Sequence, residues 1–298
     1  MDNYIIIANP VSGKGRATSV AEQAQDALTA ANHKGQLKLT NGAGDAKRFA
    51  QEAIANGIKW VISCGGDGTL HEIVNGIAKV PDVTLSILPC GRGNDLATAL
   101  KISRKPQSAI QTLLTGTPKQ IDLGHVRSEK GTEHYFTTIT TCGYDTEVSR
   151  RAAARNTPFS GTASYVYAAI ATLSQYKCPS VRIEGDFGVY EGTILLAATG
   201  STSSYGGGFK IVPNARYDDG VFDVCIIREV ASSTVLLLMV TLFWGGHLFH
   251  PAVNIHQTRS LKIQTDPPVT LYADGEPMCE TPATIEIIKH GLTVLVPS

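Results

Sequence analysis

A glycine-rich turn between an apolar segment and a predicted helix constrains this chain more than any other feature. The stretch SCGGDGTLHEIVNG, residues 63–76, follows the apolar run 60–62, which is typical of a buried strand. Glycine tolerates positive φ and has no side chain, so backbone N–H groups in the turn and at the start of the next helix can approach a ligand closely. Such a turn suits phosphate, but Asp67 lies among the glycines and needs a cation, a hydroxyl proton or a base beside it. The turn therefore indicates phosphoryl transfer.

Two further glycine-containing polar loops, NPVSGKG at 9–15 and PCGRGND at 89–95, also follow predicted strands. In a parallel sheet with right-handed crossovers the carboxyl ends of the strands share one edge, so all three loops should meet there. The first loop is not a Walker P-loop, because Gly15 follows Lys14 where a Ser or Thr is required. No GxGxxG opens a helix, which disfavours a dinucleotide site of the Rossmann type. One nucleotide site of another kind is the economical interpretation.

Strands and helices alternate in the first part of the chain. Strands are expected at 4–8, 37–39, 60–63 and 84–88, and helices at 17–31, 45–55, 70–78 and 96–100. From about Asp122 the pattern becomes β-rich, with strands expected at 134–141, 181–184, 193–199, 222–227, 261–264, 269–273 and 283–288 and one helix at 162–175.

This change of pattern predicts an α/β fold with two domains. The N-terminal α/β nucleotide-binding domain, with a mostly parallel sheet, is expected over 1–124 and is completed by about 289–298. The C-terminal β-rich, sandwich-like domain is expected over 125–288. A final strand at 292–296 could pair with either domain.

Composition narrows the class of protein. The chain has 298 residues, 43% of them hydrophobic, which is enough for more than one core. Lys plus Arg and Asp plus Glu number 26 each, so no global charge favours nucleic acid. Six cysteines without a CxxC pair speak against a zinc site or a disulfide framework and favour a cytoplasmic protein. The N-terminus lacks a signal-peptide pattern, and the longest apolar run, 235–244, is too short to span a bilayer.

Six segments together resemble the diacylglycerol kinase catalytic family, which includes bacterial soluble lipid kinases and the sphingosine and ceramide kinases. They are NPVSGKG at 9–15, GGDGTLHEIVNG at 65–76, PCGRGNDLA at 89–97, IDLG at 121–124, GGGFKIVPNARYDDGVFDV at 206–224 and ADGEP at 273–277. The similarity runs in order over almost the whole chain. GGDGT alone is shared with NAD kinases and phosphofructokinases, but its order with GND and the late DGE is specific.

The resemblance implies an ATP site between the two domains. The positions that match the family's nucleotide-binding residues are Asn9, Ser12, Gly13, Lys14, Thr40, Gly65, Gly66, Asp67, Gly68, Thr69, Glu72, Arg92, Asn94 and Asp95. Thr40 rests on the resemblance alone. Relatives usually carry threonine where this chain has Arg92, so a guanidinium there either binds phosphate or lies in solvent.

The resemblance also implies which carboxylates act in catalysis. A kinase needs a group that accepts the proton of the acceptor hydroxyl, and a carboxylate can do so. Asp274 matches the family's base region, with Glu276 as the alternative, and Asp67 is the third catalytic carboxylate. On local sequence alone, the Asp-Gly pair at 274–275 is typical of a hairpin turn.

Magnesium is implied at two places. In the family one ion is held by an aspartate and backbone carbonyls, and the matching positions are Arg216, Asp219 and Val221. Ligation by oxygen alone suits a hard cation. A second ion would arrive with ATP and contact Asp67 and Asp95, and Asp122 could extend this acidic network.

Two further features receive structural interpretations. His247 and His250 lack another ligand at metal spacing, so a packing role is favoured over a metal site. The apolar run 235–244 is interpreted as core rather than as an entrance for lipid. A lipid kinase without a spanning helix must still lift its substrate's head group from the bilayer, so some exposed apolar rim is expected.

The leading hypothesis is an ATP-dependent lipid kinase of phospholipid biosynthesis, with diacylglycerol, giving phosphatidic acid, as the favoured acceptor. Sphingosine, ceramide, monoacylglycerol, undecaprenol and phosphatidylglycerol are alternative acceptors, because one sequence does not identify the residues that select the lipid. An NAD-kinase-like enzyme and a non-catalytic nucleotide-binding module are the alternative functions. We expect a cytoplasmic protein, peripheral at the inner membrane face, that binds no nucleic acid; a homodimer is compatible with the sequence.

Overall fold

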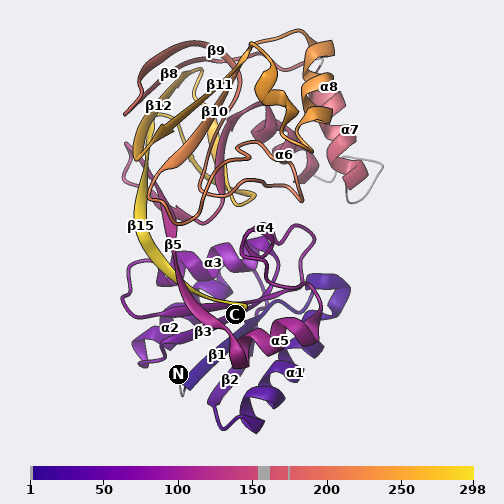
Figure 1. Cartoon of the computed structure of the whole chain (residues 1–298), viewed down its shortest axis with the longest axis vertical. Helices are drawn as coiled ribbons and strands as arrows, with labels where there is room; N and C mark the ends of the chain where they lie inside the picture. Colours follow the sequence, from indigo (N-terminus) through magenta and orange to yellow (C-terminus); the bar gives the residue numbers. More distant parts are fainter. Residues whose placement is uncertain (1–2, 154–161, 174) are drawn as a thin grey trace.

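The computed structural model describes residues 3–153, 162–173 and 175–298. Two domains lie one above the other and are joined by two long strands, β5 (Thr117–Ser128) and β15 (Ala283–Val296), which pair antiparallel and run from one domain into the other (Figure 1). This arrangement confirms the predicted two-domain α/β class.

The sheet of the first domain is mostly parallel. Its order is β2 (Lys34–Leu39), β1 (Asn3–Ala8), β3 (Trp60–Gly65) and β4 (Thr84–Pro89), with all neighbours parallel. Beyond β4, the parallel pairing of Thr293 and Val294 places β15 in the same sheet. The loops that follow β1, β3 and β4 therefore leave from one edge, as the sequence predicted.

Helices cover both faces of this sheet. One core contains side chains of α2 (Asp45–Ala55), α3 (Asp67–Ile77) and α4 (Asp95–Ala99), and the other contains those of α1 (Ala17–Ala30) and α5 (Pro106–Thr115). Side chains of β1 alternate between the two cores, with Ile5 and Ile7 in the first and Tyr4 and Ile6 in the second. This period of two is that of a strand buried on both faces.

The second domain is built from two sheets that share β9. Its strands are β6 (Glu133–Phe136), β7 (Ile139–Gly143), β8 (Ser180–Gly185), β9 (Gly188–Gly200), β10 (Phe222–Arg228), β11 (Val253–Thr258), β12 (Ser260–Asp266), β13 (Thr270–Ala273) and β14 (Glu276–Glu280). One apolar core unites inward side chains from both sheets. A second core lies between the sheet that contains β7, β9 and β10 and three helices. These helices are α6 (Tyr144–Ala153), α7 (Thr162–Leu173) and α8 (Ser232–Thr241).

Several predicted elements differ from the structure. The single strand expected at 134–141 is interrupted at Thr137 and Thr138, which separate β6 from β7. The two strands expected at 283–288 and 292–296 form one strand, β15, whose pairing with β5 is irregular between Ile288 and Leu292. The helix expected at 162–175 is α7, which ends at Leu173, and residue 174 lies outside the described residues.

The interpretation of residues 235–244 as core is only half right. Val235, Leu238 and Leu242 are buried, whereas Leu237 and Trp244 are 59% and 62% exposed. In the part of the chain that the structure describes, no helix combines the length and apolarity that crossing a bilayer requires.

Candidate functional site

The loop after β1 has a backbone conformation suited to an anion. In the single turn η1 (Ser12–Gly15), Gly13, Lys14 and Gly15 have φ of 62°, 59° and 88°. A Cβ on Gly13 would lie 2.8 Å from the carbonyl oxygen of Cys90, so only glycine allows this loop to lie against the end of β4. Lys14 is exposed beside it and can reach a phosphate.

The other two glycine loops are in contact with each other. A Cβ on Gly66 would lie 3.2 Å from the Cα of Gly91, and the N–H groups of Cys90 and Gly91 both donate to the Gly65 carbonyl. The structure thus brings together the predicted loops at one edge of the sheet.

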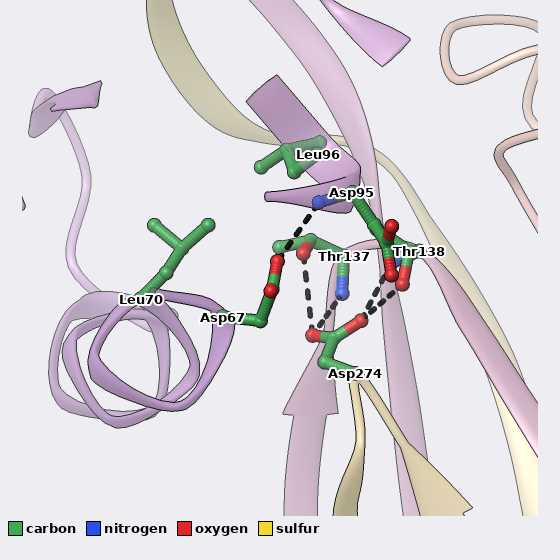
Figure 2. A pocket seen from close by; sticks show the side chains of 7 residues that line it. All are labelled: Asp67, Leu70, Asp95, Leu96, Thr137, Thr138 and Asp274. Carbon is green, nitrogen blue, oxygen red and sulfur yellow. Dashed lines mark hydrogen bonds between the residues drawn. The ribbon is translucent and has the colours of Figure 1, made fainter. Parts of the chain in front are cut away.

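Asp67 is held in place by the loop after β4. Its two carboxylate oxygens accept hydrogen bonds from the backbone N–H groups of Asn94 and Asp95, each at 2.8 Å, and Figure 2 shows the bond from Asp95. A Cβ on Gly93 would lie 2.7 Å from the same carboxylate. The charge of Asp67 is therefore offset partly by the first N–H groups of α4 and fixed in direction.

Asp95 reaches across to the second domain. Its carboxylate accepts hydrogen bonds from the N–H groups of Gly206 at 2.8 Å and Gly207 at 3.1 Å. Burial and the nearby charge of Asp67 raise the pKa of Asp95 to about 6. This pair of hydrogen bonds ties the glycine triplet 206–208 of the second domain to α4 of the first.

Asp274 and Gly275 form the tight turn of a hairpin. Both have positive φ, 52° and 85°, and Ala273 pairs with Glu276 across the turn between β13 and β14. This is the hairpin that local sequence indicated, and asparagine, aspartate and glycine are the residues that tolerate such a backbone. The turn also aims the Asp274 side chain into the break between β6 and β7.

The carboxylate of Asp274 is saturated with donors. It accepts the N–H and hydroxyl of Thr137 at 2.9 and 3.2 Å and the N–H and hydroxyl of Thr138 at 2.9 and 2.6 Å (Figure 2). The Nδ1 atom of His71, on α3, lies 3.6 Å away. Burial alone would raise the pKa of Asp274, but the nearby His71 ring and the hydrogen bonds from Thr138 and Thr137 lower it below its ordinary value.

Glu276, two residues after Asp274, differs from it in its hydrogen bonds and in the direction of its pKa shift. Among the described residues no group donates a hydrogen bond to its carboxylate. Its Oε1 lies 2.7 Å from where a Cβ on Gly68 would stand, so the carboxylate touches the first turn of α3. Partial burial between the domains raises the pKa of Glu276. A carboxylate with free lone pairs and a raised pKa is suited to accept a proton.

A small cavity of about 10 Å³ lies where the two domains meet, and this is about the space that one water molecule needs. Figure 2 shows Asp67 on one side and Asp274 with its two threonines on the other. The lining residues are Asp67, Leu70, Asp95, Leu96, Thr137, Thr138 and Asp274.

The predicted magnesium segment forms a turn beside buried Asp122. Asp122 accepts hydrogen bonds from Gly220 N–H at 2.7 Å and His290 N–H at 2.9 Å. Asp218 is paired with Lys119 at 3.2 Å, whereas Asp219 accepts the N–H of Val221, at 3.1 Å, and no other hydrogen bond from the described residues.

Several oxygen atoms near this turn accept no hydrogen bond from the described residues. Among the described residues, no hydrogen bond reaches the carbonyls of Arg216 and Val221. The Oδ2 atom of buried Asp223 also lacks a donor, and burial together with the charge of Asp219 raises the pKa of Asp223. These oxygen donors fit a hard cation, although no three His, Cys, Asp or Glu side chains cluster at metal spacing within the described ranges.

Some residues predicted to bind nucleotide are used differently. Glu72 accepts the N–H groups of Gly44 and Ala46 at 2.8 and 3.0 Å and so caps α2. The Asn94 side chain exchanges two hydrogen bonds with Gly91, which fixes its own loop. Both side chains therefore shape the loops, and the structure does not direct them into the cleft.

Of the remaining predicted residues, Thr40 is buried, and its N–H donates to Ala8 at the end of β1. The guanidinium of Arg92 is exposed and has no partner among the described residues. Asn9 accepts the N–H of Val11 and stabilises the first loop. Thr69 is buried against Gly65, where its hydroxyl would meet a Cβ at 2.6 Å.

Several residues of the site were missed by sequence reasoning. Thr137 and Thr138 carry no sequence signal, because a Thr-Thr pair is ordinary in a strand. Arg104 binds the carbonyls of Arg92 and Gly93, again without a local pattern. The glycine triplet 206–208 was not missed as a segment, because it begins the stretch 206–224 that carries the family resemblance, and the structure gives all three glycines a positive φ.

The two histidines near residue 250 have packing roles. His247 is fully buried, and its Nε2 lies 2.9 Å from the Ile211 carbonyl. His250 accepts the N–H of Ala252 on Nδ1. Neither lies near a second metal ligand in the part of the chain that the structure describes.

Comparisons with known proteins identify the family of this chain. The family model of the diacylglycerol kinase catalytic domain matches residues 3–126, and that of the YegS C-terminal NAD kinase beta sandwich-like domain matches residues 138–296. The chain is 32% identical over 301 residues to a diacylglycerol kinase of Mycobacterium tuberculosis (strain CDC 1551 / Oshkosh), covering 98% of this chain and 94% of that protein. It is 31% identical over 293 residues to a diacylglycerol kinase of Staphylococcus carnosus (strain TM300), with 98% and 94% covered.

Solved structures share the fold. A diacylglycerol kinase structure from Bacillus anthracis str. Sterne superposes with a TM-score of 0.76 at 22% identity, covering 99% of this chain and 97% of that one. A yeast NADH kinase complexed with NADH gives a TM-score of 0.50 at 10% identity, covering 99% and 83%. At these identities the likeness concerns the fold alone.

Proposed function

Because this chain belongs to the diacylglycerol kinase family, we propose that it transfers the γ-phosphate of ATP to the hydroxyl of a lipid, with diacylglycerol as the favoured acceptor. The first-domain wall of the cleft offers glycine loops with phosphate-binding geometry. The second-domain wall offers a carboxylate with free lone pairs. Phosphoryl transfer needs positioning and electrostatic stabilisation more than covalent chemistry, and these two walls supply both.

The state of Glu276 is the single observation that carries the mechanism. Sequence reasoning preferred Asp274 as the base, but four donors and His71 surround that carboxylate and lower its pKa. We therefore assign proton acceptance to Glu276 and positioning to Asp274. The lipid hydroxyl gives its proton to Glu276 as its oxygen bonds to the γ-phosphorus, and the bond from this phosphorus to the β–γ bridging oxygen breaks to release ADP.

The first domain would hold the nucleotide. The N–H groups of residues 13–15 and the Lys14 ammonium face the phosphates and offset their charge. Asp67, fixed by Asn94 and Asp95 N–H groups, would orient the metal-bound phosphates.

Magnesium is part of the proposal at two positions. Asp219, with the carbonyls of Arg216 and Val221, would hold a structural ion, because among the described residues the two carbonyls accept no hydrogen bond and Asp219 accepts one, from the N–H of Val221. An ion arriving with ATP would lie near Asp67 and Asp95 and would neutralise charge that develops on the phosphates.

The proposed enzyme acts in the cytoplasm at the inner membrane face, where its lipid substrate is located. Nucleic acid plays no part in the proposal. The shared fold with an NADH kinase makes NAD the competing acceptor.

Phosphate transfer from γ-labelled ATP with magnesium tests the function. The acceptors are diacylglycerol, monoacylglycerol, sphingosine, ceramide, undecaprenol and phosphatidylglycerol in mixed micelles, with NAD alongside. Asp67→Ala is the matched inactive variant. We expect label in one lipid, with diacylglycerol the favoured one, and a loss of label in the variant. Label in NAD and in none of the lipids would replace the lipid-kinase proposal, and ATP binding without transfer to any acceptor would support a binding module instead.

A further inference from the structure

An apolar face lies on the outer side of the second domain. It consists of exposed side chains from α8, the turn after it and the single turn η2 (Gly246–Phe249): Leu236, Leu237, Val240, Phe243, Trp244 and Phe249. The exposed fractions range from 43% at Leu236 to 92% at Phe249. Monomeric proteins seldom expose so many large apolar side chains in one short segment, so the face calls for a partner.

The opposite side of α8 packs against the rest of the second domain. Val235, Leu238 and Leu242 are buried in the core that α8 shares with α6 and α7. A helix that is apolar all round normally lies in a core or against a membrane, and α8 lies at the surface (Figure 1). On α7, which packs into the same core, Ile170 is also 55% exposed.

Charge around the face favours one kind of partner. Residues 230–258 contain no Asp, Glu, Lys or Arg at all. Residues 192–217, several of which pack into the same core, contain lysine and arginine but no acidic residue, whereas α6 carries Asp145 and Glu147. Lys210 is exposed, and its N–H donates to the Leu242 carbonyl at 2.9 Å, which places it at the end of α8. An apolar face with aromatic side chains, whose own segment 230–258 carries no carboxylate and which has Lys210 at its edge, suits an anionic lipid surface.

The face is also physically continuous with the cleft. The ring of Phe243 lies 4.8 Å from that of Phe209, between ring centres. Three residues earlier in the same loop, the N–H groups of Gly206 and Gly207 donate to Asp95 inside the site. A bilayer bound at the face would therefore lie beside the loop that closes the cleft.

We infer that the apolar face formed by α8, its following turn and η2 is the surface with which this protein docks on an anionic lipid bilayer. The inference rests on the proposed lipid-kinase function for its purpose but on the exposed side chains and charge pattern for its location. Trp244 and Phe243 enter the interfacial region, Leu237 and Val240 cover the acyl boundary, and Lys210 meets anionic head groups.

Vesicle binding without nucleotide tests the surface separately from catalysis. The probe is a phosphatidylcholine vesicle containing phosphatidylglycerol, and the variant is Leu237→Gln with Trp244→Gln. The control is Leu114→Gln with Val189→Gln, which changes two apolar residues of 38% and 51% exposure elsewhere. We expect co-sedimentation of the variant to weaken at least tenfold and that of the control to stay at the wild-type level.

Trp244 gives a second readout, because the only other tryptophan, Trp60, is buried. We expect wild-type emission to shift to the blue when vesicles are added, and Trp244→Phe to abolish the shift. Absence of wild-type binding, or equal binding by the double variant, would overturn the inference. So would a wild-type dimer that Leu237→Gln with Trp244→Gln converts to a monomer in size-exclusion chromatography, because a second copy would then cover the face.

Turnover on a short-chain diacylglycerol below its aggregation concentration separates the two proposals. We expect the face variant to phosphorylate this monomeric substrate as the wild type does, but to lose activity on vesicles at least tenfold. If the wild type phosphorylates no lipid yet binds vesicles through the face, the kinase proposal fails and the docking surface stands.

Discussion

The two walls of the cleft hold their carboxylates in different ways. On the first-domain wall, Asp67 and Asp95 each accept two backbone N–H groups, and both are fixed. On the second-domain wall, Asp274 accepts four donors, whereas Glu276, two residues away, has none among the described residues. The difference teaches that a motif alone does not identify the role of a carboxylate. Its hydrogen bonds decide whether it supports the structure or is free to accept a proton.

Replacing Glu276, the carboxylate without a donor, should have the largest effect on activity. We expect Glu276→Gln to lower kcat by about 10²–10⁴-fold with ATP affinity unchanged, because the amide cannot accept the hydroxyl proton. Turnover and nucleotide binding, measured on the same preparation, check this. Glu280→Gln, an exposed residue of the same strand β14, is the control and should keep wild-type turnover. Full activity of Glu276→Gln would return the base to Asp274.

Removing the saturated acid should act on stability. We expect Asp274→Asn to lower the free energy of unfolding by about 3–5 kcal/mol, because an amide cannot satisfy the donors of Thr137 and Thr138. The pKa of Asp274 is lowered in the folded protein, so this stabilisation is present above the ordinary value of 3.8 and is lost as pH falls through the folded value. Thermal unfolding at neutral pH measures the loss, with Asp26→Asn on exposed α1 as the control. An unchanged midpoint would contradict the structural role.

Replacing Asp145, another buried carboxylate, should raise the stability of the folded protein at neutral pH instead of lowering it. Asp145 lacks a donor for Oδ1, and burial raises its pKa from 3.8 to about 6, which corresponds to at most about 3 kcal/mol. The folded state holds this proton between pH 4 and 6 while the unfolded state releases it, so stability falls as pH rises through that range. We expect Asp145→Asn to raise the unfolding midpoint at pH 7.5 and to have little effect at pH 4. A lower midpoint at pH 7.5 would contradict this.

The smallest effect should come from Arg92. Its exposed guanidinium makes no contact with the described residues, so we expect Arg92→Thr to change the KM for ATP by less than about threefold. Arg104→Thr is the informative comparison, because Arg104 binds the carbonyls of the same loop and its loss should have a larger effect. A tenfold rise of KM in Arg92→Thr would show that this residue binds phosphate.

The first domain could be predicted well from sequence because its signals are local. Buried parallel strands and glycine loops each occupy a few consecutive residues, and the predicted strands 60–63 and 84–88 correspond to β3 and β4. Helix α5 begins with Pro106 at its first position and was missed, as was β5, whose long pairing with β15 depends on residues far along the chain. Strand pairing between distant segments leaves little trace in either segment alone.

The sequence motifs predicted which residues form the candidate site, but they did not predict the role of each residue. Sequence reasoning placed Asp67, Asp274 and Glu276 together, and the structure brings all three to the cleft. It could not rank Asp274 and Glu276, because the ranking depends on Thr137 and Thr138, which lie more than 130 positions away and break the expected strand 134–141. The hydrogen bonds of Glu72 and Asn94 were not predicted for the same reason: their partners are backbone groups that only the fold brings near.

The place of β15 has a consequence for how the protein is made. This strand is synthesised after all of the second domain, yet Thr293 and Val294 lie beside β4 in the first domain, and the N–H of His290 donates to Asp122. Domains usually fold in the order in which they leave the ribosome. Here the first domain must wait for the second, so its nascent parallel sheet keeps β4 as an open edge until translation has passed the whole second domain.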